Sequence, residues 1–430
     1  MKEINRDKYL NTLINKIDNG SIKIITGLRR SGKSYLLNVI FFNYLCNNYN
    51  KKKIIKFAFD SPEDLALIDE DYIEIHKEKR KVSSKKFLDF INSKIDKKGK
   101  YFLLLDEIQE LEVFESVLNG LLNKRNIDIF VTGSNSKLLV SDVRTEFRGR
   151  GDEIRIYPLS FREFFSSSKK DKNEAFNEYM IYGGMPLVLN YKTDEEKAKY
   201  LNDLFESTYY KDIEDRYGIK NEEVLSKLIS ILASSIGSLT NPTKLANTFK
   251  SNGINTNDKT INAYTNFLLD AFLINKAEKY DVKGKKYISS PCKYYFTDIG
   301  LRNARLNFRQ IEQTHLMENI IYNELKIRGY SVDVGVVHKY SRDGNGKQIV
   351  SDLEIDFVCN QGNKRYYIQS AFSIPDEEKM NQEQASLLRT SDEFKKIIIV
   401  KDNTKLWRNE KGITIMNIID FLLDENSLDQ

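Results

Sequence analysis

The chain has 430 residues, of which 40% are hydrophobic and 11% aromatic, so it is long enough for two or three globular domains. Its net charge of +5 is only mildly basic, which permits a nucleic-acid partner without requiring one. The three cysteines and three histidines are widely separated, which excludes a disulfide framework and a zinc site. Because Met1–Asp7 is polar and no apolar run is long enough to span a membrane, we expect a soluble cytoplasmic protein.

The stretch Gly27–Ser34 reads G-L-R-R-S-G-K-S, which has the G-x-x-x-x-G-K-S spacing of a phosphate-binding loop. It follows an apolar run, Ile22–Thr26, and precedes a helical pattern, Tyr35–Phe42. Glycines let backbone N–H groups point at an anion, and the helix N-terminus adds a positive field. We therefore expect nucleotide phosphates to be bound by eight residues: Gly27, Arg29, Arg30, Ser31, Gly32, Lys33, Ser34 and Tyr35.

Within this loop, two residues have a specific chemical role. The amine of Lys33 can reach the β- and γ-phosphates, and the hydroxyl of Ser34 can be a ligand of Mg²⁺.

Short, continuously apolar runs alternate with helical patterns through the first third of the chain. This alternation predicts an α/β domain with a parallel sheet that binds its ligand at the carboxyl ends of the strands. The predicted strands are Ile22–Thr26, Ile54–Phe59, Tyr101–Leu105 and Ile127–Thr132. The predicted helices are Tyr35–Tyr49, Lys85–Ile95 and Leu111–Lys124.

Two carboxylates follow the third of these strands. Asp106 is placed to hold Mg²⁺, and Glu107 is placed to orient or deprotonate an attacking water molecule. After the fourth strand, Ser134 or Asn135 could contact the γ-phosphate or the water. The alternative for these two residues is a turn that caps a helix starting near Lys137.

Arginines that follow this turn could stabilise charge on the phosphates, since a guanidinium group binds phosphate with two hydrogen bonds. Arg150 is the first candidate and Arg148 the second. The alternative for each is a solvated surface side chain.

Several motifs then stand in one order along the chain. After the phosphate-binding loop come L-L-L-D-E-I-Q at 103–109, T-G-S-N at 132–135, G-R at 149–150, P-L-S-F-R-E-F at 158–164 and G-G-M-P at 183–186. Together they resemble a large group of bacterial and archaeal AAA+ superfamily ATPases that carry a C-terminal domain of unknown function.

The resemblance implies that Gly27–Ser34 is the Walker A motif and that Asp106 and Glu107 form Walker B. It implies a sensor at Ser134 or Asn135, an arginine step at Gly149–Arg150, and a small helical lid after the nucleotide core. It also implies hydrolysis of ATP with Mg²⁺, and rings in which a neighbouring chain often supplies the arginine.

The middle of the chain predicts a winged helix, with helices Glu222–Ser235, Thr243–Asn252 and Lys259–Leu269 followed by strands Phe272–Ala277 and Lys285–Ile288. We expect Pro242 in the first turn of the second helix, with Asn241 as its cap. The third helix has one lysine and no arginine, whereas the wing carries Lys283, Lys285, Lys286 and Lys293. DNA binding and a role in protein contacts both remain open.

In the C-terminal region, a predicted helix, Leu316–Arg328, carries Glu318, and it precedes strands Val332–Tyr340, Leu353–Cys359, Tyr366–Ala371 and Lys395–Val400. This order of elements resembles the restriction-endonuclease-like fold. Asp356 on the second strand matches one acidic ligand of such nucleases. Gln369 and Ala371 stand where a second acid and a lysine are expected. We therefore predict a nuclease-like module that no longer cuts, in which Glu318 and Asp356 are a structural polar pair.

These expectations give four regions: a P-loop ATPase core at 1–165, a helical lid at 166–218, a winged-helix module at 219–300 and a nuclease-like α/β module at 301–430. The predicted function is ATP hydrolysis that drives conformational change in the C-terminal modules, associated with nucleic acid. The alternatives are a nucleotide-dependent switch that binds a protein partner, and an ATP-regulated nuclease. A homo-oligomer is compatible with each, and the sequence does not decide whether Arg150 acts in its own chain.

Overall fold

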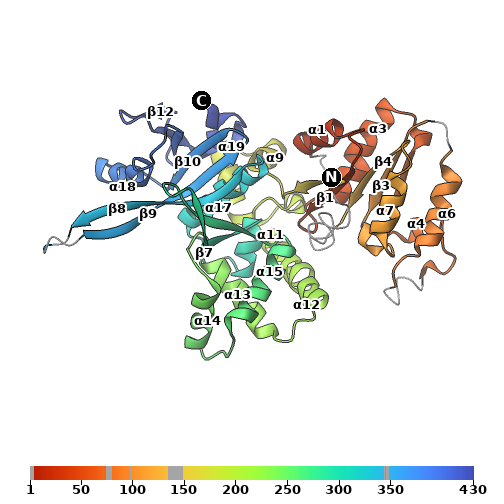
Figure 1. The fold of residues 1–430 in the computed structure, drawn as a ribbon, viewed down its shortest axis with the longest axis horizontal. Helices are drawn as coiled ribbons and strands as arrows, with labels where there is room; N and C mark the ends of the chain where they lie inside the picture. Colours follow the sequence, from red (N-terminus) through yellow and green to blue (C-terminus); the bar gives the residue numbers. More distant parts are fainter. Residues whose placement is uncertain (1–3, 74–79, 97–98, 134–148, 343, 345–347) are drawn as a thin grey trace. The chain divides into compact units, whose positions relative to one another are not determined.

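The computed structural model describes residues 4–73, 80–96, 99–133, 149–342, 344 and 348–430 (Figure 1). The chain forms two compact units. The first comprises Met1–Pro158 together with Asp270–Phe272, and the second comprises Leu159–Leu269 together with Leu273–Gln430.

The first unit is built on a parallel five-stranded sheet with the order β2-β3-β4-β1-β5. The strands are β1 (Ile22–Gly27), β2 (Ile54–Ala58), β3 (Tyr101–Asp106), β4 (Ile127–Thr132) and β5 (Gly151–Ile156). The four predicted strands and their parallel arrangement are confirmed, and β5 is a fifth strand at the edge that the sequence pattern did not reveal. Every residue of β1, β3 and β4 is buried, as expected for central parallel strands covered on both faces.

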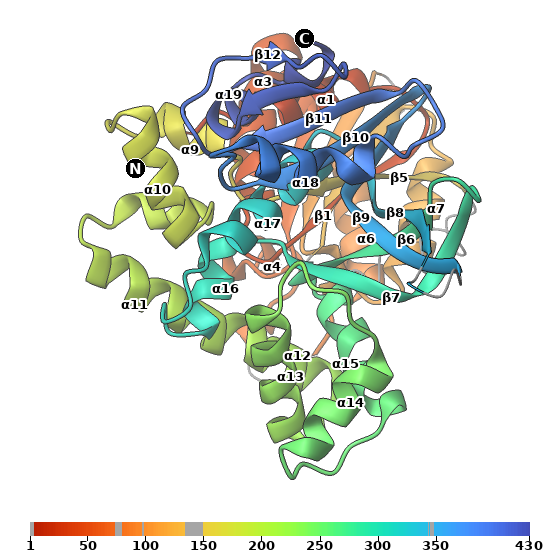
Figure 2. The same ribbon diagram turned by 90° about the vertical axis from the view of Figure 1, so that its left-hand side faces the viewer.

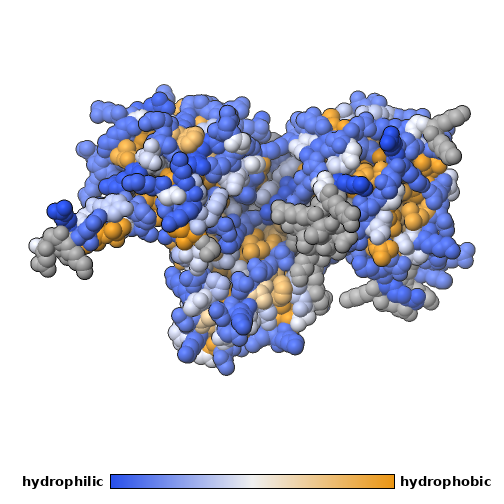
Figure 3. Space-filling model, viewed as in Figure 1, coloured by the Kyte–Doolittle hydropathy of each residue, from blue (hydrophilic) through white to orange (hydrophobic). Residues whose placement is uncertain are grey.

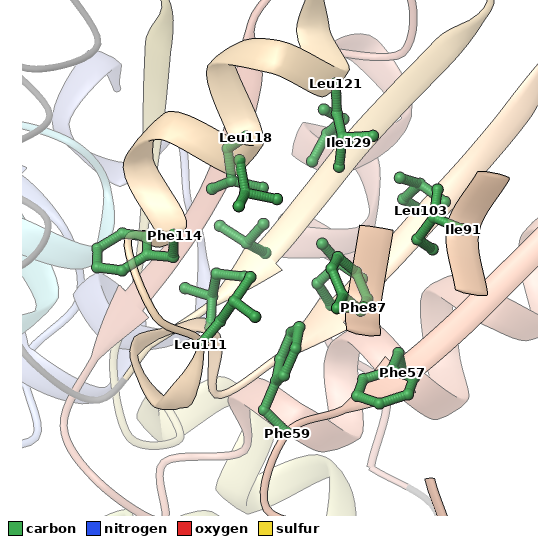
Figure 4. Close-up of a cluster of buried hydrophobic side chains, with 14 of the residues drawn as sticks. Phe57, Phe59, Phe87, Ile91, Leu103, Leu111, Phe114, Leu118, Leu121 and Ile129 are labelled. Carbon is green, nitrogen blue, oxygen red and sulfur yellow. The ribbon is translucent and has the colours of Figure 1, made fainter. Parts of the chain in front are cut away.

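Apolar side chains of β3 alternate between two cores. Leu103 and Leu105 belong to one cluster, while Phe102 and Leu104 belong to the other, which follows from the two-residue period of a strand. The first cluster joins the sheet to α6 (Ser84–Lys94) and α7 (Phe114–Leu122) through side chains such as Phe87 and Leu118 (Figure 4).

The other face of this sheet is covered by α1 (Asp7–Asn15) and by a continuous helical stretch that follows the phosphate-binding loop. That stretch consists of α2 (Lys33–Tyr35), a π-helical segment (Leu36–Phe41) and α3 (Phe42–Asn48). A short helix, α4 (Pro62–Leu65), follows β2.

The second unit begins with helices whose starts are defined by local side-chain caps. Ser160 and Glu163 form a capping box on α9, and Asn241 caps α14 by accepting a hydrogen bond from the backbone N–H of Lys244 (2.7 Å), with Pro242 in the first turn as predicted. The helices up to the sheet are α9 (Phe161–Ser167), α10 (Lys172–Tyr182), α11 (Asp194–Leu204), α12 (Lys211–Tyr217), α13 (Glu222–Ser234), α14 (Pro242–Ser251) and α15 (Asp258–Asp270). In both views, α13, α14 and α15 form one lobe of this unit (Figures 1 and 2).

An eight-stranded sheet with the order β12-β13-β11-β10-β9-β8-β6-β7 forms the rest of the second unit. Its strands are β6 (Ile274–Asp281), β7 (Lys286–Phe296), β8 (Ser331–Arg342), β9 (Gln348–Gln361), β10 (Lys364–Ala371), β11 (Lys395–Val400), β12 (Trp407–Arg408) and β13 (Thr414–Asn417). The helices among them are α16 (Ile299–Arg305), α17 (Gln313–Ile327), α18 (Glu377–Leu387) and α19 (Ile418–Leu423).

The hairpin of β6 and β7 differs from the free wing expected from the sequence. β6 pairs in parallel with β8 from Lys279↔Val334 to Asp281↔Val336, so the hairpin extends the C-terminal sheet. An edge strand presents unpaired backbone groups, and pairing β6 with β8 satisfies them. The regions expected as 219–300 and 301–430 therefore share one sheet.

In the part of the chain that the structure describes, no helix is both long enough and apolar enough to cross a membrane. In the view of Figure 3, the surface of each unit is mainly hydrophilic, with scattered apolar residues.

Candidate functional site

The loop that follows β1 has a backbone that its glycines make possible. Gly27 has φ +135°, and a Cβ atom there would lie 2.1 Å from the carbonyl oxygen of Ile156 on β5, so no larger residue fits. Gly32, just before α2, has φ +100° and a left-handed conformation, and Arg30 has φ +59°. The chain thus curls between the carboxyl end of β1 and the first turn of α2.

The curl of the loop surrounds the amine of Lys33. This side chain is buried, and its Nζ donates hydrogen bonds to the carbonyl oxygens of Gly27 and Leu28, each at 3.1 Å. The hydroxyl of Ser31 is also buried, and it has no hydrogen-bond partner among the described residues. Since a buried hydroxyl without a partner costs about 1–3 kcal/mol, a phosphate oxygen is a fitting partner for it.

Asp106, at the carboxyl end of β3, lies beside the start of α2. Its Oδ1 accepts a hydrogen bond from Ser34 Oγ (3.1 Å) and another from Thr132 Oγ1, and its Oδ2 accepts one from Asn38 Nδ2 (2.7 Å). Burial, with a further contribution from the negative charge of Glu107, raises the pKa of Asp106 above its ordinary value. The predicted magnesium ligands Ser34 and Asp106 are thus brought together, and a hydroxyl and a carboxylate suit Mg²⁺.

Glu107 follows Asp106 in a left-handed conformation, with φ +51°. Its backbone N–H donates to Thr132 Oγ1 (3.0 Å), and its carboxylate accepts a hydrogen bond from Gln109 Nε2. A non-glycine residue in this region costs of order 1 kcal/mol, so the contacts around it have to hold it there. The side chain is half-buried at the same edge of the sheet as the loop.

Three residues of this site were missed by the sequence analysis: Asn38, Gln109 and Thr132. The sequence indicated Thr132 only as the end of a strand and the first residue of the T-G-S-N motif. Its role follows from the strand order: β4 lies between β1 and β3, so the last residue of β4 lies between the loop and the carboxylates.

Arg150 is far from the loop within its own chain. It immediately precedes β5, whose first residue, Gly151, pairs with Ile22 at the start of β1, whereas the loop follows Gly27 at the other end. Ile22 and Gly27 are five residues apart along β1, which corresponds to about 16 Å at roughly 3.3 Å per residue. Arg150 is exposed at the amino edge of the sheet.

The remaining predicted site residues fall into two groups. Arg29, Arg30 and Tyr35 are exposed on the loop and the first turn of α2. Ser134, Asn135 and Arg148 lie outside the described residues.

Lys293 is not available as a surface contact for DNA. It was expected on an exposed wing, but it is 2% exposed and paired with carboxylates of the second unit. It lies on β7 opposite Ala277 of β6, and its amine contacts Glu318 on α17 and Glu354 on β9. Lys283, Lys285 and Lys286, at the turn of the hairpin, are exposed.

The chain matches two protein-family models and is similar to several known proteins. A family model for an AAA domain matches residues 19–165, and a model for a domain of unknown function (DUF8612) matches residues 173–312. A Walker-type ATPase of Pyrococcus abyssi has a solved structure that aligns with 71% of this chain and 96% of its own, with 15% identity and a TM-score of 0.49.

Two relatives align over nearly the whole chain. One, from Methanocaldococcus jannaschii, is 27% identical and covers 93% of this chain and 88% of its own length; it is described as an uncharacterized protein. The other, an uncharacterized protein of Haemophilus influenzae, is 35% identical over 431 residues and covers 98% of each chain. The chain therefore belongs to the family of AAA-domain proteins that includes this Haemophilus influenzae protein.

Proposed function

We propose that the protein binds ATP with Mg²⁺ at the loop Gly27–Ser34 and hydrolyses it. The observation that carries this proposal is the 3.1 Å hydrogen bond between Ser34 and Asp106 at the end of that loop. This hydrogen bond connects the two residues expected to hold Mg²⁺: Ser34 at the end of the phosphate-binding loop and Asp106 at the end of β3. The buried, unpartnered hydroxyl of Ser31 adds a polar group suited to a phosphate oxygen.

In this proposal each residue of the site has one task. The backbone N–H groups of the loop and the amine of Lys33 bind the β- and γ-phosphates. When bound, Mg²⁺ supplies positive charge that neutralises the phosphate oxygens. Ser34 and Asp106 would hold that ion.

Glu107 orients the water molecule that attacks the γ-phosphate and accepts its proton. Gln109 and Thr132 are positioning residues, since one holds the carboxylate of Glu107 and the other its backbone. Asn135 would contact the γ-phosphate or the water as a sensor.

Arg150 would act on the nucleotide of a second copy of the chain. Its place at the amino edge of the sheet supports this assignment, because within one chain the strand length separates it from the loop. The proposal therefore includes a homo-oligomer in which each site is completed by a neighbouring chain.

Hydrolysis would drive conformational change in the C-terminal part of the chain, with 166–218 as a helical lid. We further propose that the region 219–300 is a winged helix whose wing, the β6–β7 hairpin, also joins the C-terminal sheet, and that the protein is associated with nucleic acid. The exposed lysines Lys283, Lys285 and Lys286 support this, since clustered positive charge binds phosphate backbones.

The test is phosphate release by the full chain with ATP and Mg²⁺, with and without duplex DNA, together with the solution mass with and without ATP. Turnover that DNA stimulates, with a steep loss of stimulation as salt rises, is the expected result. Turnover without any response to DNA, accompanied by nucleotide-dependent binding of a protein partner, would replace the nucleic-acid role with that of a regulatory switch. Absence of turnover under all conditions would overturn the hydrolytic assignment.

A further inference from the structure

A buried lysine of the second unit lies among three carboxylates that come from two other elements. Nζ of Lys293 on β7 is 2.9 Å from Glu318 Oε1 on α17, 2.6 Å from Glu354 Oε1 on β9 and 3.8 Å from Asp356 Oδ1 on β9. The lysine side chain is only 3% exposed. We call these four residues the Lys293 cluster.

The groups around the Lys293 cluster hold its carboxylates in place. Tyr295 donates its hydroxyl to Glu318 Oε1 (2.7 Å), and the backbone N–H of Ser370 donates to Asp356 Oδ2 (2.8 Å). The turn between α13 and α14 lies against the same site, since a Cβ atom on Gly237 would come within 2.9 Å of both carboxylate oxygens of Glu318. The cluster is therefore closed on the side of Glu318, where no space is left beside the carboxylate.

One carboxyl of the cluster, that of Asp356, is shifted towards its neutral form. Burial, followed by the negative charge of Glu318, raises the pKa of Asp356 well above its ordinary value, so this carboxyl tends to keep its proton. The ammonium group lies 2.9 Å from Glu318 and 2.6 Å from Glu354, and the side chain of Glu354 is 34% exposed to water. A buried cation needs such partners, because removing a charge from water without compensation is costly.

The lysine reaches this site from a strand that the sequence motif did not include. The expectation was that the pocket had lost its lysine, because Ala371 stands at the motif position on β10. Ala371 keeps the motif position on β10, and the lysine of the pocket comes instead from β7, where Lys293 lies opposite Ala277 on β6, outside the part of β6 that pairs with β8. In the described residues, no group of histidine, cysteine, aspartate and glutamate side chains is arranged to hold a metal ion.

We propose that Lys293 is the resident cation of this carboxylate pocket: its tethered ammonium group supplies the positive charge around which the three carboxylates are arranged, and it joins β7, α17 and β9. The reason is geometric, since Nζ lies within hydrogen-bond distance of two carboxylates and within 4.0 Å of the third. A second, divalent cation would have to approach a fixed positive charge at contact distance. The pocket is therefore closed to metal in the native chain, and loss of the lysine charge opens it.

The first experiment compares Lys293→Met with the native residue by thermal unfolding, with and without Ca²⁺ or Mn²⁺. Both chains carry Asp106→Asn, which removes one of the two proposed magnesium ligands at the ATP site. We expect the native pocket to show no change in Tm with either ion. Lys293→Met is expected to unfold several degrees lower and to recover as the ion concentration rises, since an ion that binds only the folded state stabilises it. Lys293→Met combined with Asp356→Asn is expected to lose that recovery.

The matched control is Lys279→Met, which removes a lysine of the neighbouring strand β6 that pairs with the exposed Asp352 (3.2 Å). It is expected to show no ion-dependent change in Tm. A Lys293→Met chain that unfolds at the native temperature, or that does not respond to either ion, overturns the proposal.

A second measurement needs no change at Lys293 and covers the case in which that variant does not fold. Mn²⁺ is titrated into the Asp106→Asn chain and followed by electron paramagnetic resonance. The proposal expects no stoichiometric site in the second unit. One Mn²⁺ bound per chain that is lost in Asp356→Asn would overturn it, and cleavage of DNA by the same sample would then assign the pocket to a metal-dependent nuclease.

Discussion

The hydroxyl of Thr132, the last residue of β4, donates a hydrogen bond to the carboxylate of Asp106, the last residue of β3. The hydroxyl oxygen of Thr132 also accepts a hydrogen bond from the backbone N–H of Glu107 (3.0 Å). One threonine therefore fixes both the residue proposed to hold Mg²⁺ and the one proposed to orient water. This is possible only because β4 lies between β1 and β3 in the sheet.

Thr132→Val should lower both stability and turnover. The substitution keeps the shape of the side chain but leaves the buried carboxylate of Asp106 and the N–H of Glu107 each without one partner, which costs about 1–3 kcal/mol. Urea unfolding and phosphate release measure the two effects. Thr132→Ser, which keeps the hydroxyl, is the control and should retain most of both. Equal turnover in the valine and serine variants would remove Thr132 from the site.

Lys33→Ala should weaken ATP binding by about 10- to 100-fold, because a hydrogen bond to a charged group contributes about 1.5–3 kcal/mol. Calorimetric titration of nucleotide measures the affinity. The control is Lys85→Ala, which removes an exposed lysine of α6 and should leave the affinity unchanged. An unchanged affinity in Lys33→Ala would contradict its assignment to the phosphates.

Glu107→Gln should keep nucleotide binding and reduce turnover by about 10²- to 10⁴-fold, the usual contribution of a general base. The amide has nearly the same shape but cannot accept the proton of the attacking water. Binding and phosphate release are measured on the same sample. Glu112→Gln, at a nearby exposed position, should behave as the native chain does. Native turnover in Glu107→Gln would assign proton transfer to another residue.

Arg150→Ala should leave the affinity for ATP unchanged and reduce turnover only in the oligomer. The decisive test mixes Arg150→Ala chains with Lys33→Ala chains, each of which is expected to be poorly active alone. In the mixture, the intact loop of the first chain can meet the intact arginine of the second, so turnover should recover. If mixing gives no recovery, Arg150 acts within its own chain or has no part in hydrolysis.

The buried Asp298 should make stability depend on pH. Its carboxylate caps α16 and accepts hydrogen bonds from the backbone N–H groups of Gly184 (2.7 Å) and Leu301 (3.0 Å). Burial raises the pKa of Asp298 from 3.8 to about 6. Between these two pKa values the folded chain binds a proton that the unfolded chain does not, so the free energy of unfolding falls as pH rises through this range.

The measurement for Asp298 is the free energy of unfolding in urea at about pH 4.5 and about pH 7, compared with Asp298→Asn, which has no proton to lose. The advantage of the native chain over this variant should shrink by about 2 kcal/mol at the higher pH. A constant difference between the two chains would show that Asp298 does not titrate in this range.

Much of the architecture could be predicted from sequence because its signals are local. The apolar runs at Ile22–Thr26, Tyr101–Leu105 and Ile127–Thr132 each become a strand of the parallel sheet. The two-residue and 3.6-residue periods also predicted α13, α14, α15, α17, β8, β10 and β11 to within about three residues at each end, whereas β7 and β9 extend well beyond the expected ranges. Strand β5 was missed because its residues Gly151, Asp152 and Glu153 are polar at an edge.

The phosphate-binding loop can be identified from local sequence, since Gly27, Gly32 and Lys33 lie within seven residues and their conformations follow from local chemistry. Which distant side chains meet depends on the tertiary fold. Strand order placed Thr132 beside Asp106, and strand register placed Arg150 at the opposite edge of the sheet. Because β6 pairs with β8, the hairpin expected as a wing is also part of the C-terminal sheet. Lys293, on the other strand of this hairpin, contacts Glu318 and Glu354. The physical reason is that periodicity specifies which face of an element is buried, whereas the contacts between elements depend on their order and register in the sheet.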